Sequence, residues 1–148
     1  MRGVVFLLAA CALASACASV PSAGTTPPSA SVRIPSTPID LGDWRRAGAS
    51  ALIQHFEREI AARYTTGAPL SAVSADLGRN DFVCAENRDT AGRGNPPAQI
   101  CRKAAALENC THTWQVHLFN ANGGATLVRT RALYDRRCGG DGLLGGPG

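Results

Sequence analysis

The chain has 148 residues, enough for one small domain with terminal extensions. Its 15 basic and 11 acidic residues give a formal net charge of +4, and the arginines are scattered without interleaved aromatic residues, which argues against a nucleic-acid partner. The six cysteines include no Cys-x-x-Cys pair of the kind that zinc and dithiol redox sites use. We therefore expect neither a metal nor a cofactor.

Residues 1–16 have the pattern of an export signal. Arg2 supplies a positive charge, the apolar run over residues 4–13 is too short to span a bilayer, and the small residues at 14–16 fit a cleavage site. The pattern predicts that residues 1–16 are a removed signal peptide, which would place the mature protein outside the cytoplasm.

Cys17, directly after this segment, resembles the acylated cysteine of bacterial lipobox-type lipoproteins. The resemblance implies diacylation (palmitate) of its thiol and a membrane anchor, and Ala18 after the cysteine points to the outer membrane, on the periplasmic side. Two alternatives stay open. Leu13 is four places before Cys17 rather than the usual three, so an ordinary signal peptidase could release a secreted protein, and Cys11 follows a better-matching triplet.

Cysteine counting supports lipid attachment at Cys17. Removal of the signal leaves an odd number of cysteines in an oxidising compartment, and acylation of Cys17 leaves an even four: Cys84, Cys101, Cys110 and Cys138. Four cysteines allow three pairings. The hairpins described below favour two disulfides, Cys84 with Cys101 and Cys110 with Cys138.

Composition divides the rest of the chain into three parts. Residues 17–40 are rich in proline and serine and are predicted to be a flexible tether behind the lipid-attachment cysteine. Residues 41–138 are predicted to form a single α+β domain, and the glycine-rich residues 139–148 a flexible tail.

The domain begins with a helical pattern. Apolar or small residues recur every four positions from Trp44 through Leu52, Phe56 and Ile60 to Tyr64, which predicts a helix over this span. A shorter helix is expected from Pro69 to Gly78. Together they form an N-terminal helical pair.

An alternating pattern then predicts strands at residues 81–86, 98–103, 113–120 and 125–136, with a possible helical turn at 104–109. Asn122-Gly123 marks a hairpin that brings Cys110 near Cys138, and Cys84 and Cys101 are symmetric about a turn near residue 92. Val128, Ala132 and Tyr134 are expected in the buried set of the last strand. The predicted fold is a helical pair packed on a three- or four-stranded antiparallel sheet, stapled by two disulfides.

No group of residues convincingly predicts catalysis. His112 and His117 are five apart on one strand, which places them on opposite faces, and His55 has no companion on its helix. Phe119 shares the face of His117, where it is either exposed as part of a contact patch or buried at the edge of the sheet. His117 and Phe119 are therefore the possible contacts for a partner.

The order of lipid cysteine, tether, helical pair and antiparallel sheet, with residues 67–73 (GAPLSAV) leading to Leu77-Gly78, resembles the small SmpA/OmlA (BamE-like) outer-membrane lipoproteins. The four cysteines and the long segment 87–97 depart from that family's pattern. The resemblance implies a non-enzymatic module that binds another envelope component, such as an envelope protein partner. The alternatives are a small periplasmic inhibitor or ligand-binding module that inserts residues 87–97 into a target, and, third, a secreted enzyme.

Overall fold

The computed structural model describes residues 33–88, 94–121 and 123–139. The predicted signal peptide, Cys17, most of the predicted tether and residues 140–148 lie outside the described residues. The elements are, in chain order, α1 (Ala49–Arg63), α2 (Leu70–Arg79), β1 (Val83–Glu86), β2 (Gln99–Leu107), β3 (Cys110–Asn120) and β4 (Leu127–Cys138).

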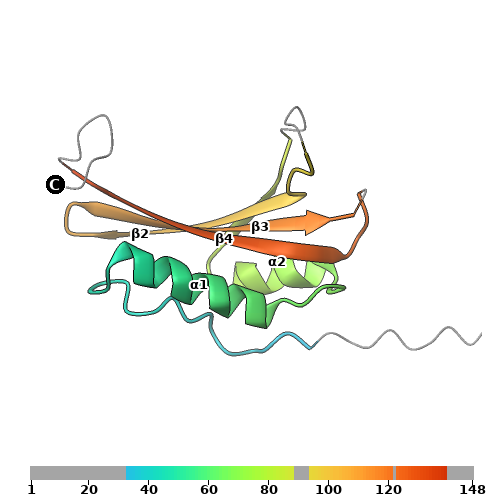
Figure 1. The fold of residues 1–148 in the computed structure, drawn as a ribbon, viewed down its shortest axis with the longest axis horizontal. Coiled ribbons are helices and arrows are strands. Elements are labelled where there is room, and N and C mark those ends of the chain that lie inside the picture. The colour runs from blue at the N-terminus through green and yellow to red at the C-terminus, as the bar shows by residue number, and fades with distance from the viewer. Residues whose placement is uncertain (1–32, 89–93, 122, 140–148) are drawn as a thin grey trace, which may run out of the picture. The chain divides into compact units, whose positions relative to one another are not determined.

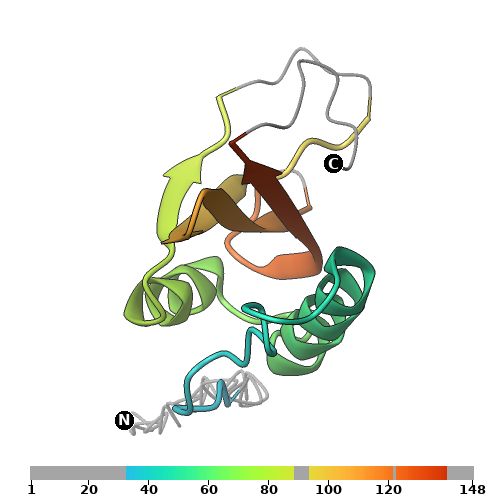
Figure 2. The ribbon, with the colours of Figure 1, turned by 90° about the vertical axis from the view of Figure 1, so that its left-hand side faces the viewer.

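The four strands form one antiparallel sheet in the order β1-β2-β3-β4. Both helices lie on the same face of this sheet (Figures 1 and 2), which gives a two-layer α+β fold. Directly opposed cysteines form the two disulfides, Cys84–Cys101 between β1 and β2 and Cys110–Cys138 between β3 and β4. The predicted fold class and both disulfide pairings are confirmed.

The helices bury the apolar residues that the four-residue spacing identified. Leu52, Phe56 and Ile60 of α1 and Val73 and Leu77 of α2 are buried in the core. On the sheet side, the core continues with inward-facing residues of β3, namely Trp114, Val116 and Leu118. Full burial of each large side chain contributes about 1.5–3 kcal/mol, so the core holds the two layers together. Neither helix in the described part of the chain is long and apolar enough to cross a membrane.

The first helix begins later than predicted. Trp44 lies in a turn in which the Asp43 carbonyl accepts hydrogen bonds from the amides of Arg46 and Ala47, and α1 starts only after Gly48. The Trp44 ring packs edge-on against Trp114, with 5.5 Å between ring centroids. Trp44 therefore fits the apolar spacing because it packs against the sheet, although it lies outside the helix.

A helical turn at residues 104–109, left open by the sequence, is not formed. β2 runs on to Leu107, and β3 begins at Cys110, so a two-residue turn joins them. Glu108 in this turn has a φ of 55°, in the left-handed region that tight hairpin turns require. Three consecutive alanines at 104–106 favour a helix locally, and pairing with β3 overrides this preference.

The expectation that Val128 is buried is wrong. A β-bulge shifts the register so that Phe119 opposes Arg129 while Asn120 opposes Leu127, which leaves Val128 as the extra residue. Leu127 consequently turns into the core at 1% exposure, and Val128 is 40% exposed.

The predicted tether includes residues that belong to the domain. Ile39 is part of the core, and its amide donates to Asn80 Oδ1 at 2.7 Å. The carbonyls of Pro35 and Thr37 accept hydrogen bonds from Arg63 Nη2 at 2.9 and 2.7 Å. The folded domain therefore starts ahead of residue 41, the boundary set from composition.

Candidate binding surface

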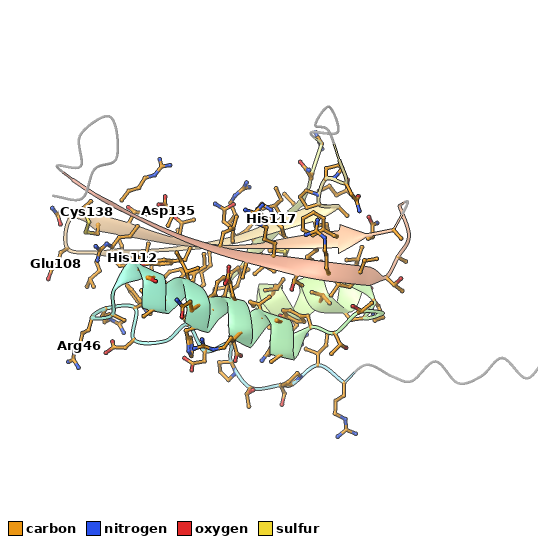
Figure 3. The ribbon with its side chains drawn as sticks, in the orientation of Figure 1. Arg46, Glu108, His112, His117, Asp135 and Cys138 are labelled. Carbon is orange, nitrogen blue, oxygen red and sulfur yellow. A yellow bond between two sulfur atoms is a disulfide. The ribbon has the colours of Figure 1, made fainter. Side chains whose placement is uncertain are left out.

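The face of the sheet opposite the helices, called the outer face below, carries no helix in the described part of the chain. Strand alternation assigns to it the residues that face away from the core. Figure 3 shows His117 and Asp135 on this side and His112 on the helix side. The predicted placement of the two histidines on opposite faces is therefore confirmed. The charged residues that β2 and β4 place on the outer face are Arg102, Arg129, Arg131, Asp135 and Arg137.

These charges do not balance. Four arginines against one aspartate leave a net charge of +3 on the outer face. Asp135 is paired with Arg137, with Oδ2 3.0 Å from Nε. Among the described residues, no carboxylate lies within ion-pair distance of Arg102, Arg129 or Arg131. The positive charge of these three side chains is thus left for solvent or for a ligand.

His117 lies between two of these arginines. It opposes Arg131 on β4 and Ile100 on β2, and Arg102 lies two residues further along β2. Burial, together with the positive charges of Arg131 and Arg102, lowers the pKa of the His117 imidazole below its ordinary value. The ring is therefore neutral at pH 7. Its Nε2 atom is enclosed and has no hydrogen-bond partner within the described ranges.

Of the two alternatives left open for Phe119, an exposed contact and burial at the sheet edge, the structure bears out burial. The residue does lie on the outer face, but its exposure is only 4%. The Arg129 guanidinium lies 3.4 Å from the centroid of the Phe119 ring, because the bulge places the two residues opposite each other. Such a cation–π contact contributes about 0.5–2 kcal/mol. A partner at this point would meet Arg129 first and not the phenylalanine ring.

Arg102 and Arg131 keep their guanidinium groups available. Arg102 Nε makes a long hydrogen bond of 3.3 Å to Gln115 Oε1 on the neighbouring strand. Both arginines point away from the core, and neither forms an ion pair with a described residue. Because guanidinium groups bind carboxylates and phosphates through two parallel hydrogen bonds, this pair can recognise anionic groups.

A cleft of about 420 Å³ lies on the helix side of the sheet. Its charged lining residues pair with one another. Arg79 contacts Asp76 at 2.8 Å, and Lys103 contacts Asp81 at 3.1 Å. The cleft therefore has no net charge to offer a ligand, in contrast to the outer face.

His112 belongs to the core and not to the cleft. Its Nδ1 lies 2.7 Å from the Tyr134 hydroxyl, and its ring packs against Trp44 at 5.0 Å and near Trp114. Burial, with the nearby charge of Arg136, lowers the pKa of His112. Within the residues that the structure describes, no three histidine, cysteine, aspartate or glutamate side chains are grouped closely enough to hold a metal ion.

Sequence reasoning found His117 but missed the two arginines that flank it. The sequence did not predict the register of β2 against β3, because it did not decide whether residues 104–109 form a helical turn or continue the strand. Once β2 is extended to Leu107, alternation places Arg102 on the face of His117. Comparison with known proteins finds no family model, curated protein or solved structure that matches the chain significantly.

Proposed function

We propose that this protein is a non-enzymatic, lipid-anchored cell-envelope protein on the periplasmic side of the outer membrane. Acyl chains on Cys17 hold it to the membrane, and its domain binds an envelope protein partner through the outer face. Two disulfides in a small domain support export, because such bonds persist in oxidising compartments. With four cysteines paired, Cys17 is the remaining cysteine of the expected mature chain.

The observation that carries the binding role is the asymmetry of the sheet. One face is covered by two helices, and the other presents three arginines without acidic partners among the described residues: Arg102, Arg129 and Arg131. Arginine and aromatic residues are enriched at protein interfaces, whereas lysine is depleted. The only lysine of the chain, Lys103, lies on the inner side of β2. The outer face therefore has the composition of a protein contact surface.

Mass analysis tests the anchor. We expect the protein extracted from membranes to carry the mass of acyl chains on a chain that begins at Cys17, and to gain four hydrogens on reduction of two disulfides. Cys17→Ser should move the protein into the soluble periplasmic fraction, whereas the control Cys11→Ser should leave it in the membrane fraction. An unmodified protein that starts at Cys17 and leaves the cell in soluble form would contradict the anchor.

Cross-linking in intact envelopes tests the partner. We expect a discrete adduct that the double variant Arg102→Gln/Arg131→Gln loses and that the control Arg58→Gln, on the exposed side of α1, retains. The alteration is confined to side chains on the outer face, so folding should be unaffected, and circular dichroism checks this. Equal cross-linking of both variants would contradict the use of the outer face.

A further inference from the structure

We infer that the outer face recognises an acidic segment of its protein partner, with the guanidinium groups of Arg102 and Arg131 binding two carboxylates on either side of His117. This inference rests on the proposed function, because it names the chemistry of the partner at the same surface. It goes further by assigning the residues that make the contact and the kind of side chain they bind.

The register of the sheet sets the spacing of the two arginines. Gln115 opposes both Arg102 on β2 and Leu133 on β4, and Arg131 lies two residues from Leu133. The two arginines are thus diagonal across β3. With strands about 4.8 Å apart and about 3.3 Å per residue, their Cα atoms are about 12 Å apart. This distance suits two carboxylates of one extended segment better than a single carboxylate.

The electrostatic environment favours negative charge at this place. Arg131 opposes His117 on β4, and Arg102 lies two residues from Ile100, which opposes His117 on β2, so the two charges converge on one region of the sheet. Arg129 adds a third positive charge above Phe119. Complementary charge steers association and fixes the orientation of a partner, so an acidic segment is the ligand that this arrangement selects.

The neighbouring side chains favour a protein over a lipid surface. Ile100 and Leu133 lie on the outer face beside the arginines, and Phe119 lies beneath Arg129, so the positive charge is interleaved with apolar side chains. This mixture is typical of the centre of protein interfaces. Binding to anionic bilayers instead relies on clusters of about four to eight lysines and arginines, whereas pairing of Arg137 with Asp135 leaves only Arg102, Arg129 and Arg131 free of ion pairs on this face among the described residues.

His117 reports on occupancy of the site. In the free protein its charged neighbours are Arg131 on β4 and Arg102 on β2, and Gln115 and Phe119 flank it on its own strand. A carboxylate bound between the arginines offsets their charge. The pKa of His117 should then rise, and a variant that fails to bind the carboxylate should not show the rise.

The test uses the purified mature protein and a short unstructured peptide that alternates glutamate with serine, with a matched peptide that carries glutamine in place of glutamate. We expect the glutamate peptide to bind at low ionic strength and to weaken as salt is added. Arg102→Gln and Arg131→Gln should each weaken binding by about tenfold. The control Arg137→Gln, whose side chain is paired with Asp135, should change binding by less than about twofold. The histidine ring signals should show the pKa of His117 rising on saturation, and not in Arg131→Gln.

Equal binding of the two peptides, or an equal loss in Arg137→Gln, would overturn the inference. Binding of vesicles that contain anionic phospholipid, lost in the same two variants while the peptide does not bind, would assign the surface to lipid and also overturn it. The failure of the inference is separable from that of the proposed function. If the cross-linked partner is lost in Arg102→Gln/Arg131→Gln but the peptide does not bind, only the acidic segment is contradicted. If the peptide binds but the native protein carries no acyl chains, only the anchor is contradicted.

Discussion

Replacement of Asp76 by asparagine should destabilise the domain strongly. Asp76, on α2, is 1% exposed, and its carboxylate accepts hydrogen bonds from Arg63 Nε at 2.7 Å, Tyr64 Oη at 2.7 Å and Arg79 Nη2 at 2.8 Å. Arg63 is itself buried, so the variant leaves a buried guanidinium without its counter-charge and turns an amide N–H₂ toward donors. Removal of one partner of a buried ion pair costs about 3–5 kcal/mol, a large share of the roughly 5–15 kcal/mol that stabilises a domain.

Urea denaturation monitored by tryptophan fluorescence measures this loss, since Trp44 and Trp114 both lie between the layers. With an m-value of about 1.5 kcal/mol/M, a loss of about 3 kcal/mol lowers the midpoint by about 2 M. Asp135→Asn is the matched control, because that exposed carboxylate pairs with Arg137 on the surface and should cost about 0.5 kcal/mol or less. If Asp76→Asn remained within about 1 kcal/mol of the wild type, the reasoning would be refuted.

The same network predicts a dependence on pH. Burial acts to raise the pKa of Asp76, but hydrogen bonds from Arg63 and Tyr64 outweigh it and hold the pKa below the ordinary value. The folded state therefore binds fewer protons than the unfolded state as the pH falls below about 4, the value for an unfolded aspartate. The contribution of Asp76 is present above that pH and is lost as the pH falls through its folded pKa. The difference between wild type and Asp76→Asn should shrink correspondingly in acid.

Three further variants test other parts of the structure. The double variant Cys110→Ser/Cys138→Ser removes a disulfide with a sequence separation of 28 residues and should lower the free energy of unfolding by about 3–4 kcal/mol. Urea denaturation without reductant measures this loss, and an unchanged midpoint would contradict a structural role for the bond. Burial lowers the pKa of His112, so the unfolded chain takes up a proton before the folded chain does, and stability falls as the pH drops below about 6.5. His112→Gln should reduce this loss of stability. An identical pH profile in the variant would show that another group is responsible. Phe119→Ala should lower the free energy of unfolding by about 2–4 kcal/mol besides any effect on binding, because the ring is buried beneath Arg129; a fully stable variant would mean that the ring is a surface group after all.

Much of the fold is encoded by local spacing, and these parts were predicted. The four-residue recurrence of Leu52, Phe56 and Ile60 specifies one face of α1 whatever packs against it. The symmetric positions of Cys84 and Cys101 about their connecting segment follow from hairpin geometry alone, and the hairpin at residues 122–123 brings Cys110 to within a few residues of facing Cys138.

Features set by distant segments were not predicted. Arg63 and Asp76 are 13 residues apart, and Arg63 also donates hydrogen bonds to the carbonyls of residues 35 and 37. No local sequence pattern predicts this hydrogen-bond network. Phe119 was assigned to the correct face, but its burial depends on Arg129 being opposite. That pairing arises only because a bulge at Val128 shifts the register, and alternation along one strand cannot reveal it.

Residues 35–39 dock against the helices, so a force applied to the chain ahead of the domain acts on this segment first. In Figure 1 this segment runs along the helix layer, on the side of the molecule away from the outer face. A pull on it loads the two hydrogen bonds from Arg63 and the packing of Ile39 before it loads the sheet. In a single-molecule force measurement, the first event should therefore be a short extension as residues 33–41 detach. The sheet, with both cross-links intact, should keep its shape, and a cargo held on its far side would not be released by the strain.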